Sequence, residues 1–257
     1  MHHVVLDDLN LAYDDEGAGH PLLLLHGFTG TARSHLGDLI DYLKRNWRVI
    51  APDLRGYGAS RPPFRDFPPD FYQRDADDMI RLLEHLNPGP VVVLGFSDGA
   101  ESALLLAATR PDLVCGVVAW GVAGVISAPM AAAAQQWLPV SAWDASRASW
   151  RDEIIANHGA DQLAPLIEGW AAAAQAIYAA GGNICYDQAD RIACPVLLLN
   201  GDGEVNNLAT DFFRLAERIA HCRATIIAAS GHGIQFDQPA QLRDLIRTFL
   251  EEELCLN

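Results

Sequence analysis

The chain has 257 residues, of which 50% are hydrophobic and 20% are charged, as is usual for a globular protein with a sizeable core. Its formal net charge is -15 at pH 7. Nucleic acids and anionic membrane surfaces bind proteins mainly through Lys and Arg, so this charge argues against both as partners.

The cysteines and the N-terminal segment give no targeting or metal signal. The cysteines are scattered and form no C-x-x-C pair; they lie at positions 115, 185, 194, 222 and 255. The opening MHHVVLDDLN has no basic stretch followed by an apolar one, and no apolar run reaches the roughly 18 residues of a membrane span. We therefore expect reduced thiols, a cytoplasmic location, and no metal or cofactor.

Alternating apolar and amphipathic segments predict the fold class. The loosely alternating VVLDDLNLAYDDEG predicts an antiparallel hairpin or edge strand. Helices are predicted over residues 33–45, 71–86, 99–109, 207–220 and 238–252. Strands buried on both faces are predicted for PLLLLHGF, NWRVIAPD, GPVVVLGF, LVCGVVAWG, CPVLLLNGD and RATIIAAS. This order indicates a mostly parallel, doubly wound α/β sheet.

One segment, residues 122–192, interrupts the alternation. It has no convincing strand, and its Pro and Gly residues predict several short helices inserted into a core formed by 1–121 and 193–257. It carries seven acids and three arginines, a net charge of -4 that we expect to be mostly solvated. We expect its tryptophans to pack mainly within the insertion rather than line a ligand site; they are Trp137, Trp143, Trp150 and Trp170.

The stretch GFSDG, residues 95–99, fits the pattern G-x-S-x-G between a predicted strand and a predicted helix. In a nucleophile elbow this pattern holds a serine on a strained turn at the end of a strand. Gly95 and Gly99 would then allow strand and helix to approach closely. The alternative is an ordinary turn of small residues. The strand and helix around Ser97 favour the elbow.

A serine nucleophile requires a base and an orienting carboxylate. Among nine histidines, His232 lies between two glycines after a buried strand, at the sheet edge where the elbow is expected. The carboxylate should follow an earlier strand, where GDGE offers two acids. We expect Glu204, three residues after Gly201, with Asp202 as the alternative.

The segment HGF, residues 26–28, follows the first buried strand and predicts part of an oxyanion hole. We expect the backbone N–H groups of Phe28 and Asp98 to bind the oxyanion. We expect His26 to brace the loop rather than act as an acid or base.

The set HGFTG, DLRGYGAS, GFSDGA, GDGE and SGH resembles the α/β-hydrolase superfamily over residues 20–250. Within it, the S-D-G elbow and GGNICYDQADRIACP resemble the biphenyl hydrolase-like (valacyclovir hydrolase) group, which includes an enzyme that cleaves α-amino acid esters. The resemblance implies that the insertion is a lid and that Asp98 binds a substrate ammonium. The alternative for Asp98 is an acid that stabilises the helix N-terminus. This group has Asp where the chain has Glu204.

These observations predict a serine hydrolase that cleaves carboxylic esters through an acyl-enzyme, with a preference for α-amino acid esters. A dehalogenase or epoxide hydrolase would need Asp in place of Ser97. An enol-lactonase, a C–C hydrolase or a perhydrolase would use the same residues, so these remain alternatives. A hydrolase-fold receptor with slow turnover is the alternative outside the enzymes.

Overall fold

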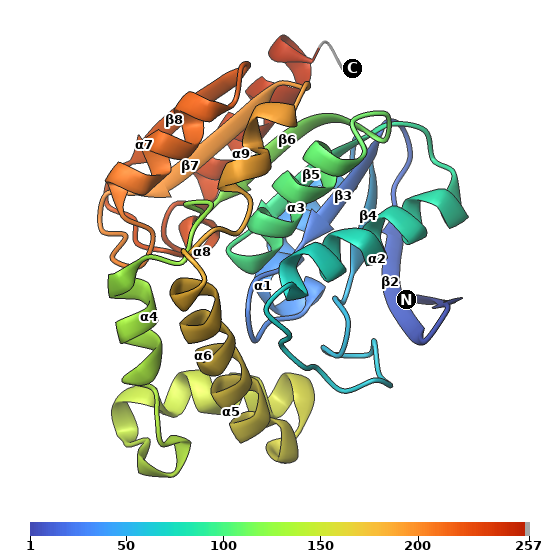
Figure 1. Ribbon diagram of the computed structural model, residues 1–257. Coiled ribbons are helices and arrows are strands. Elements are labelled where there is room, and N and C mark those ends of the chain that lie inside the picture. Colours follow the sequence, from blue (N-terminus) through green and yellow to red (C-terminus); the bar gives the residue numbers. More distant parts are fainter. Residues whose placement is uncertain (255–257) are drawn as a thin grey trace.

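A single sheet forms the centre of the computed structural model, which describes residues 1–254 (Figure 1). Its strand order is β1-β2-β4-β3-β5-β6-β7-β8. Pairing is antiparallel between β1 and β2 and between β2 and β4, and parallel elsewhere. The strands are β1 His2–Leu6, β2 Leu9–Glu16, β3 Pro21–Leu25, β4 Arg48–Pro52, β5 Val91–Phe96, β6 Val114–Trp120, β7 Val196–Gly201 and β8 Cys222–Ile227.

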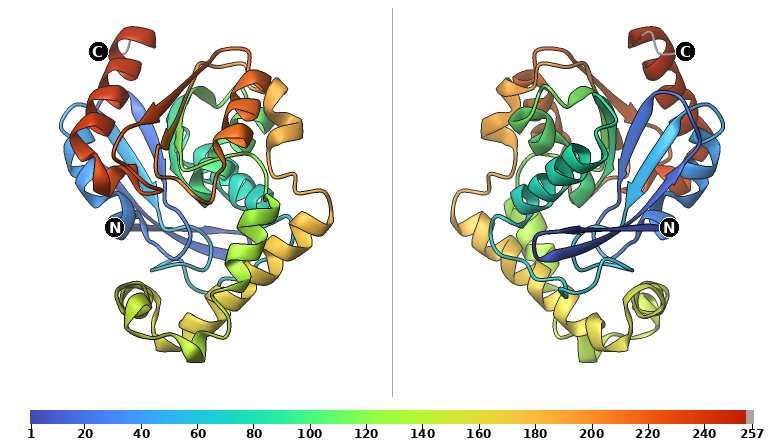
Figure 2. Two further views of the ribbon diagram at one scale, coloured as in Figure 1. Left: turned by 90° about the vertical axis from the view of Figure 1, so that its left-hand side faces the viewer. Right: turned by 90° about the vertical axis from the view of Figure 1, so that its right-hand side faces the viewer.

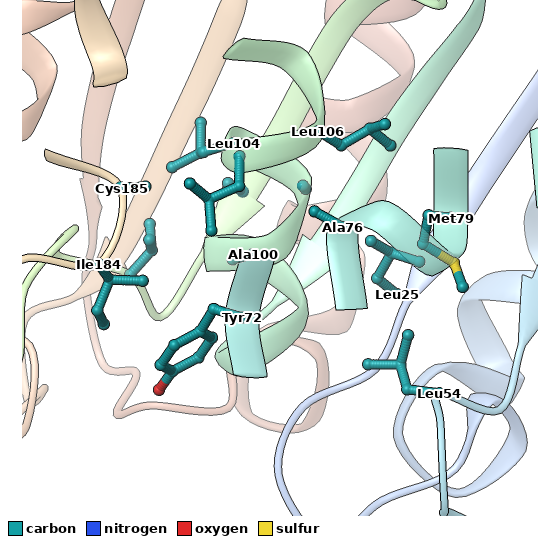
Figure 3. Packing of buried hydrophobic residues seen from close by; sticks show 14 of the residues in the cluster. Leu25, Leu54, Tyr72, Ala76, Met79, Ala100, Leu104, Leu106, Ile184 and Cys185 are labelled. Carbon is teal, nitrogen blue, oxygen red and sulfur yellow. The ribbon is translucent and has the colours of Figure 1, made fainter. Parts of the chain in front are cut away.

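Helices cover both faces of the sheet. Side chains of a strand alternate between faces, so Leu23 and Leu25 join one apolar cluster while Leu22 and Leu24 join the other. Figure 3 shows the first cluster between α2, α3 and the sheet. The second lies under α1 and α9. The helices of this core are α1 Ala32–Leu43, α2 Phe71–Leu86, α3 Asp98–Thr109, α7 Ala209–Arg218, α8 Ile234–Asp237 and α9 Pro239–Thr248.

The predicted α/β fold class is confirmed, and each of the apolar segments predicted to be a strand forms one. The burial predicted for RATIIAAS is wrong, because β8 is an edge strand and most of its residues are partly or fully exposed. The expected opening hairpin is β1 and β2, and β2 continues into the sheet by pairing with β4. The helix predicted over 238–252 is interrupted. After α9 ends at Thr248, a π-helical turn spans Phe249–Glu253 and turns Phe249 and Leu250 into the core.

Between β6 and β7 the chain forms α4 Ala128–Gln135, α5 Ala148–His158 and α6 Leu163–Ala179, with short 3-10 turns. Figures 1 and 2 show these helices together at one end of the sheet. The segment leaves and returns side by side, since Val125 and Asn183 form an isolated antiparallel bridge. No helix within residues 1–254 combines the length and apolar character that crossing a membrane requires.

Contacts near α5 fasten this segment to the core. The Nδ1 atom of His158 accepts a hydrogen bond from the amide of Gly58 at 3.0 Å, and its Nε2 lies 2.8 Å from the carbonyl oxygen of Thr29. The indole N–H of Trp150 donates to Oγ1 of Thr29 at 2.9 Å. The insertion is therefore docked on the loops that follow β3 and β4.

Candidate active site

Ser97 occupies the sharp turn between β5 and α3. Its backbone has φ 55° and ψ -121°, a region that residues with a side chain rarely adopt. The two glycines around it are sterically required. A Cβ on Gly95 would lie 2.5 Å from the carbonyl oxygen of Gly99, and a Cβ on Gly99 would lie 2.4 Å from that of Leu25. The elbow forms because only glycine permits this crossing of strand and helix.

Ser97, His232 and Glu204 form a continuous chain of hydrogen bonds. The hydroxyl oxygen of Ser97 lies 2.9 Å from Nε2 of His232, and Nδ1 of His232 lies 2.5 Å from Oε2 of Glu204. Asp202, the alternative acid, instead accepts a hydrogen bond from the amide of Ser230 at 3.3 Å. The geometry thus places Glu204, and not Asp202, against the imidazole.

The Glu204 side chain is only 2% exposed. Burial by itself would raise the pKa of Glu204, but the hydrogen bond and the charge of His232, together with two backbone hydrogen bonds, outweigh it. The amides of Asn206 and Asn207 also donate to Oε1, at 2.7 Å and 3.3 Å. The net effect lowers the pKa of Glu204 below its usual value, so the carboxylate stays ionised beside the imidazole.

The loop that carries His232 is held close to the end of β6. Gly121 has φ +66°, and a Cβ at this position would lie 2.9 Å from Cε1 of His232. The amide of Gly231 donates to Asp237 at 2.8 Å. Gly121 was not identified from the sequence as a residue of the site, although the Trp-Gly pair at the end of the strand predicts a backbone turn at this position.

The loop of residues 26–28 passes directly beside the serine. A Cβ on Gly27 would lie 2.9 Å from Cβ of Ser97. Among residues 1–254, the backbone N–H groups of Phe28 and Asp98 have no intramolecular acceptor, so both are free to bind an oxygen near the serine.

His26 stands behind this loop and is fully buried. Its Nε2 accepts from the amide of Leu54 at 2.9 Å, and its Nδ1 lies 2.9 Å from the carbonyl oxygen of Gly27. Burial lowers the pKa of His26 to about 3. A neutral, enclosed imidazole with these contacts fits the expected bracing role.

A cavity of about 300 Å³ opens over Ser97. Phe28 stacks on Trp137 and Trp170, with ring centroids 6.0 Å and 5.2 Å apart. Both tryptophans and Trp150 line the cavity, whereas Trp143 stacks on Trp150. The expectation that these tryptophans mainly fill the interior of the insertion is therefore wrong for three of the four, because the insertion folds over the serine.

Asp98 also lines the cavity, and its side chain is buried. Its two carboxylate oxygens accept hydrogen bonds from the hydroxyl of Tyr72 and the indole N–H of Trp170, each at 3.0 Å. Burial raises the pKa of Asp98 to about 6, although the charge of Arg65 and these hydrogen bonds oppose the shift. The carboxylate contacts the cavity wall rather than the amides of its own helix.

Two further wall residues were not identified from the sequence. Tyr72 looked like an ordinary member of an amphipathic helix. Glu101 had a usable signal, because it is an acid in the otherwise apolar run AESALLLAA just after the elbow. In the structure it is 4% exposed and lines the same cavity as Ser97 and Asp98.

Comparisons with known proteins define the class to which this protein belongs. Residues 22–245 match the family described as "Alpha/beta hydrolase family", and the chain belongs to that family. The mouse and human proteins named "Serine hydrolase BPHL" are each 31% identical to it over 253 residues, which cover 96% of this chain and 85% of theirs. The resemblance to the biphenyl hydrolase-like group is confirmed, and the protein is a hydrolase.

Solved structures agree on the fold. A thermophilic esterase from Thermogutta terrifontis has a TM-score of 0.72 and 25% identity, covering 95% of this chain and 94% of that one. An enol-lactonase from Burkholderia xenovorans has a TM-score of 0.75 and 21% identity, covering 98% and 100%. The second likeness shows a shared fold alone.

Proposed function

We propose that the protein is a serine hydrolase that cleaves carboxylic esters through an acyl-enzyme. The observation that supports this most directly is the hydrogen-bonded chain from Ser97 through His232 to Glu204 at the base of a cavity. A serine hydroxyl becomes nucleophilic when an adjacent base accepts its proton, and a carboxylate orients that base.

In the first half of the reaction, the oxygen of Ser97 attacks the ester carbonyl while Nε2 of His232 accepts the hydroxyl proton. The carbonyl oxygen becomes an oxyanion, which the free N–H groups of Phe28 and Asp98 stabilise. His232 then protonates the alcohol oxygen as the C–O bond breaks, leaving an acyl group on Ser97. In the second half, His232 deprotonates a water that attacks the acyl group, and Ser97 recovers its proton as the acid leaves.

The acyl groups that we propose are α-amino acids, whose ammonium would pair with Asp98. Two facts support this preference. The Asp98 carboxylate is held at the cavity wall by Tyr72 and Trp170, and no Lys or Arg is among the described residues that line the cavity. A buried carboxylate in a cavity lined by no Lys or Arg favours cationic ligands and disfavours anionic ones.

Replacing the nucleophile tests the reaction class. For Ser97→Ala we expect the kcat for p-nitrophenyl esters to fall by roughly 10^4- to 10^6-fold, because no oxygen remains to form the acyl-enzyme. A fluorophosphonate probe should label the wild type at Ser97 and leave the variant unlabelled. Retained esterase activity would contradict the assignment. Labelling with only a single turnover of every ester would favour a receptor.

Replacing Asp98 tests the acyl preference. For Asp98→Asn we expect KM for α-amino acid esters to rise about 10- to 100-fold, because a charge-assisted contact is lost. Simple acetate esters, which lack the ammonium, serve as the control and should change little. Because the pKa of Asp98 is raised to about 6, the preference for amino acid esters should also weaken as pH falls through 6. Equal effects on both ester classes would rule out the ammonium contact.

A further inference from the structure

A second carboxylate faces the substrate cavity from the same helix as Asp98. Glu101 lies three residues after Asp98 on α3, and both residues line the cavity. Residues at this spacing share one face of a helix, with Cβ atoms about 5–6 Å apart. With a relative exposure of only 4%, Glu101 has lost most of its contact with water. The cavity therefore holds two poorly hydrated carboxylates side by side.

The hydrogen bonds of Glu101 leave one oxygen poorly satisfied. Oε1 accepts from the amides of Ala123 and Gly124, at 3.3 Å and 2.9 Å. Among the contacts of residues 1–254, Oε2 accepts only from the thiol of Cys185, at 3.1 Å. Figure 3 shows Cys185 and its neighbour Ile184 beside α3. A thiol is a weak donor, so this buried oxygen lacks the strong partner that a carboxylate in such a site requires.

The cavity wall supplies no positive charge for this pair. Its described lining contains no Lys or Arg and includes a third acid, Glu153. The nearby Arg65 is already paired with Asp75 through two contacts of 2.6 Å and 2.7 Å. His35 also lines the cavity, but burial, and secondarily the nearby histidines, lower its pKa to about 3, so it is neutral. When both carboxylates are ionised, no Lys or Arg of the described lining balances their charge, and a cationic ligand would do so.

We infer that the cavity accepts acyl groups carrying two ammonium groups, with the α-ammonium at Asp98 and a side-chain ammonium at Glu101, as in esters of lysine or ornithine. This inference rests on the proposed ester hydrolysis and adds a second cation subsite to it. Met130 and Ile184, apolar residues of the same cavity, would contact the methylenes between the two charges.

The test compares the kcat/KM of a lysine ester with that of the matching norleucine ester, which has the same four-carbon chain without the terminal ammonium. We expect the wild type to prefer the lysine ester about 10- to 100-fold. Glu101→Gln should bring this ratio close to one. Glutamine keeps an acceptor oxygen for the amides of Ala123 and Gly124, so a purely structural role would leave the ratio unchanged. The control, Asp98→Asn, should slow both esters and preserve the ratio.

The pH dependence of the same ratio in the wild type provides a second measurement that needs no variant. Burial raises the pKa of Glu101 to about 7. The titratable groups around it are Asp98 on α3, Tyr72 on α2, Cys185 on the insertion, and His35, Glu153 and His232, which line the same cavity. His232 and the substrate α-ammonium act on both esters and cancel in the ratio. The preference for the lysine ester should therefore increase from pH 6 to pH 8 as Glu101 ionises.

The outcomes separate this inference from the proposed function. If the wild type hydrolyses the norleucine ester at least as efficiently as the lysine ester, the second cation subsite is wrong while the ester hydrolase proposal stands. A ratio that is flat between pH 6 and pH 8 would also overturn it. If the wild type hydrolyses no ester, the proposed function itself fails.

Discussion

At the residue scale, the position of an acidic residue within the loop after β7 decides whether its carboxylate contacts the imidazole of His232. Asp202 and Glu204 follow the same strand, yet only Glu204 contacts His232, whereas Asp202 accepts from the amide of Ser230. The longer side chain of Glu204 is held in place by the amides of Asn206 and Asn207. Its hydrogen bonds keep it ionised, so it is suited to stabilise the positive charge that develops on His232.

Conservative replacements at these two acids should separate their roles. For Glu204→Gln we expect kcat to fall by roughly 10^3- to 10^4-fold, since the imidazolium loses its charged partner. Asp202→Asn is the matched control. It keeps an oxygen acceptor for the amide of Ser230 and should stay within roughly tenfold of the wild type. Steady-state kinetics on one p-nitrophenyl ester measures both. A larger loss for the Asp202 variant would reverse the assignment.

At the element scale, the crossing of β5, α3 and the loop after β3 fixes the site. The backbone at Gly99 approaches the carbonyl oxygens of Leu25 and His26 so closely that no side chain fits. This approach brings the N-terminus of α3 against the loop that carries Phe28. Ser97 is consequently held in its strained conformation by packing on both sides.

A glycine-to-alanine pair tests this packing. Gly99→Ala would place its Cβ 2.5 Å from the carbonyl oxygen of His26, and we expect it to lower the free energy of unfolding by roughly 1–3 kcal/mol. In Gly37→Ala, the control within α1, the new Cβ has no heavy atom within 4 Å. That change should raise the free energy of unfolding by about 0.5–1 kcal/mol, because alanine favours the helix. Urea unfolding of both variants provides the comparison; equal stabilities would contradict the close approach.

At the scale of the whole molecule, the insertion covers the exposed end of the sheet and forms an acidic, aromatic cavity there. Trp137, Trp150 and Trp170 come from the insertion, whereas Asp98 and Glu101 come from the core. Burial of Asp98 and Glu101 strengthens their electrostatic interactions with a cationic ligand, but it also makes the ionised form of each carboxylate costly. The burial of Asp98 and Glu101 therefore couples stability to pH.

This coupling predicts a pH-dependent difference between the wild type and Glu101→Gln. The pKa of Glu101 is about 7 in the folded protein, above its ordinary value of 4.5, so between these values the folded state binds a proton that the unfolded state does not. The stability of the wild type relative to the variant should thus increase by about 1.4 kcal/mol for each pH unit between 7 and 4.5, as pH falls. Urea unfolding without ligand measures the difference. A constant difference over this range would show that burial does not shift this pKa.

Much of the site could be predicted because its geometry follows from local rules. G-x-S-x-G between an apolar strand and a helix predicted the position of Ser97, and a histidine between two glycines after a strand predicted His232. Chain order limited the candidate acids to Asp202 and Glu204, and the spacing after Gly201 favoured Glu204 with Asp202 as the alternative. The contacts of Asp98 could not be predicted from the sequence, since its partners Tyr72 and Trp170 lie 26 and 72 residues away along the chain.

The sequence by itself determined the order of strands and helices, the nucleophile elbow and the family resemblance. These features depend on strand burial, glycine spacing and turn chemistry, which are properties of neighbouring residues. Only the tertiary structure decided which tryptophans line the cavity and which residues contact the carboxylate of Asp98. It alone also placed Glu101 in the wall of the same cavity. Those properties depend on how the insertion packs against α2 and α3, and contacts between distant segments leave no periodic trace in the chain.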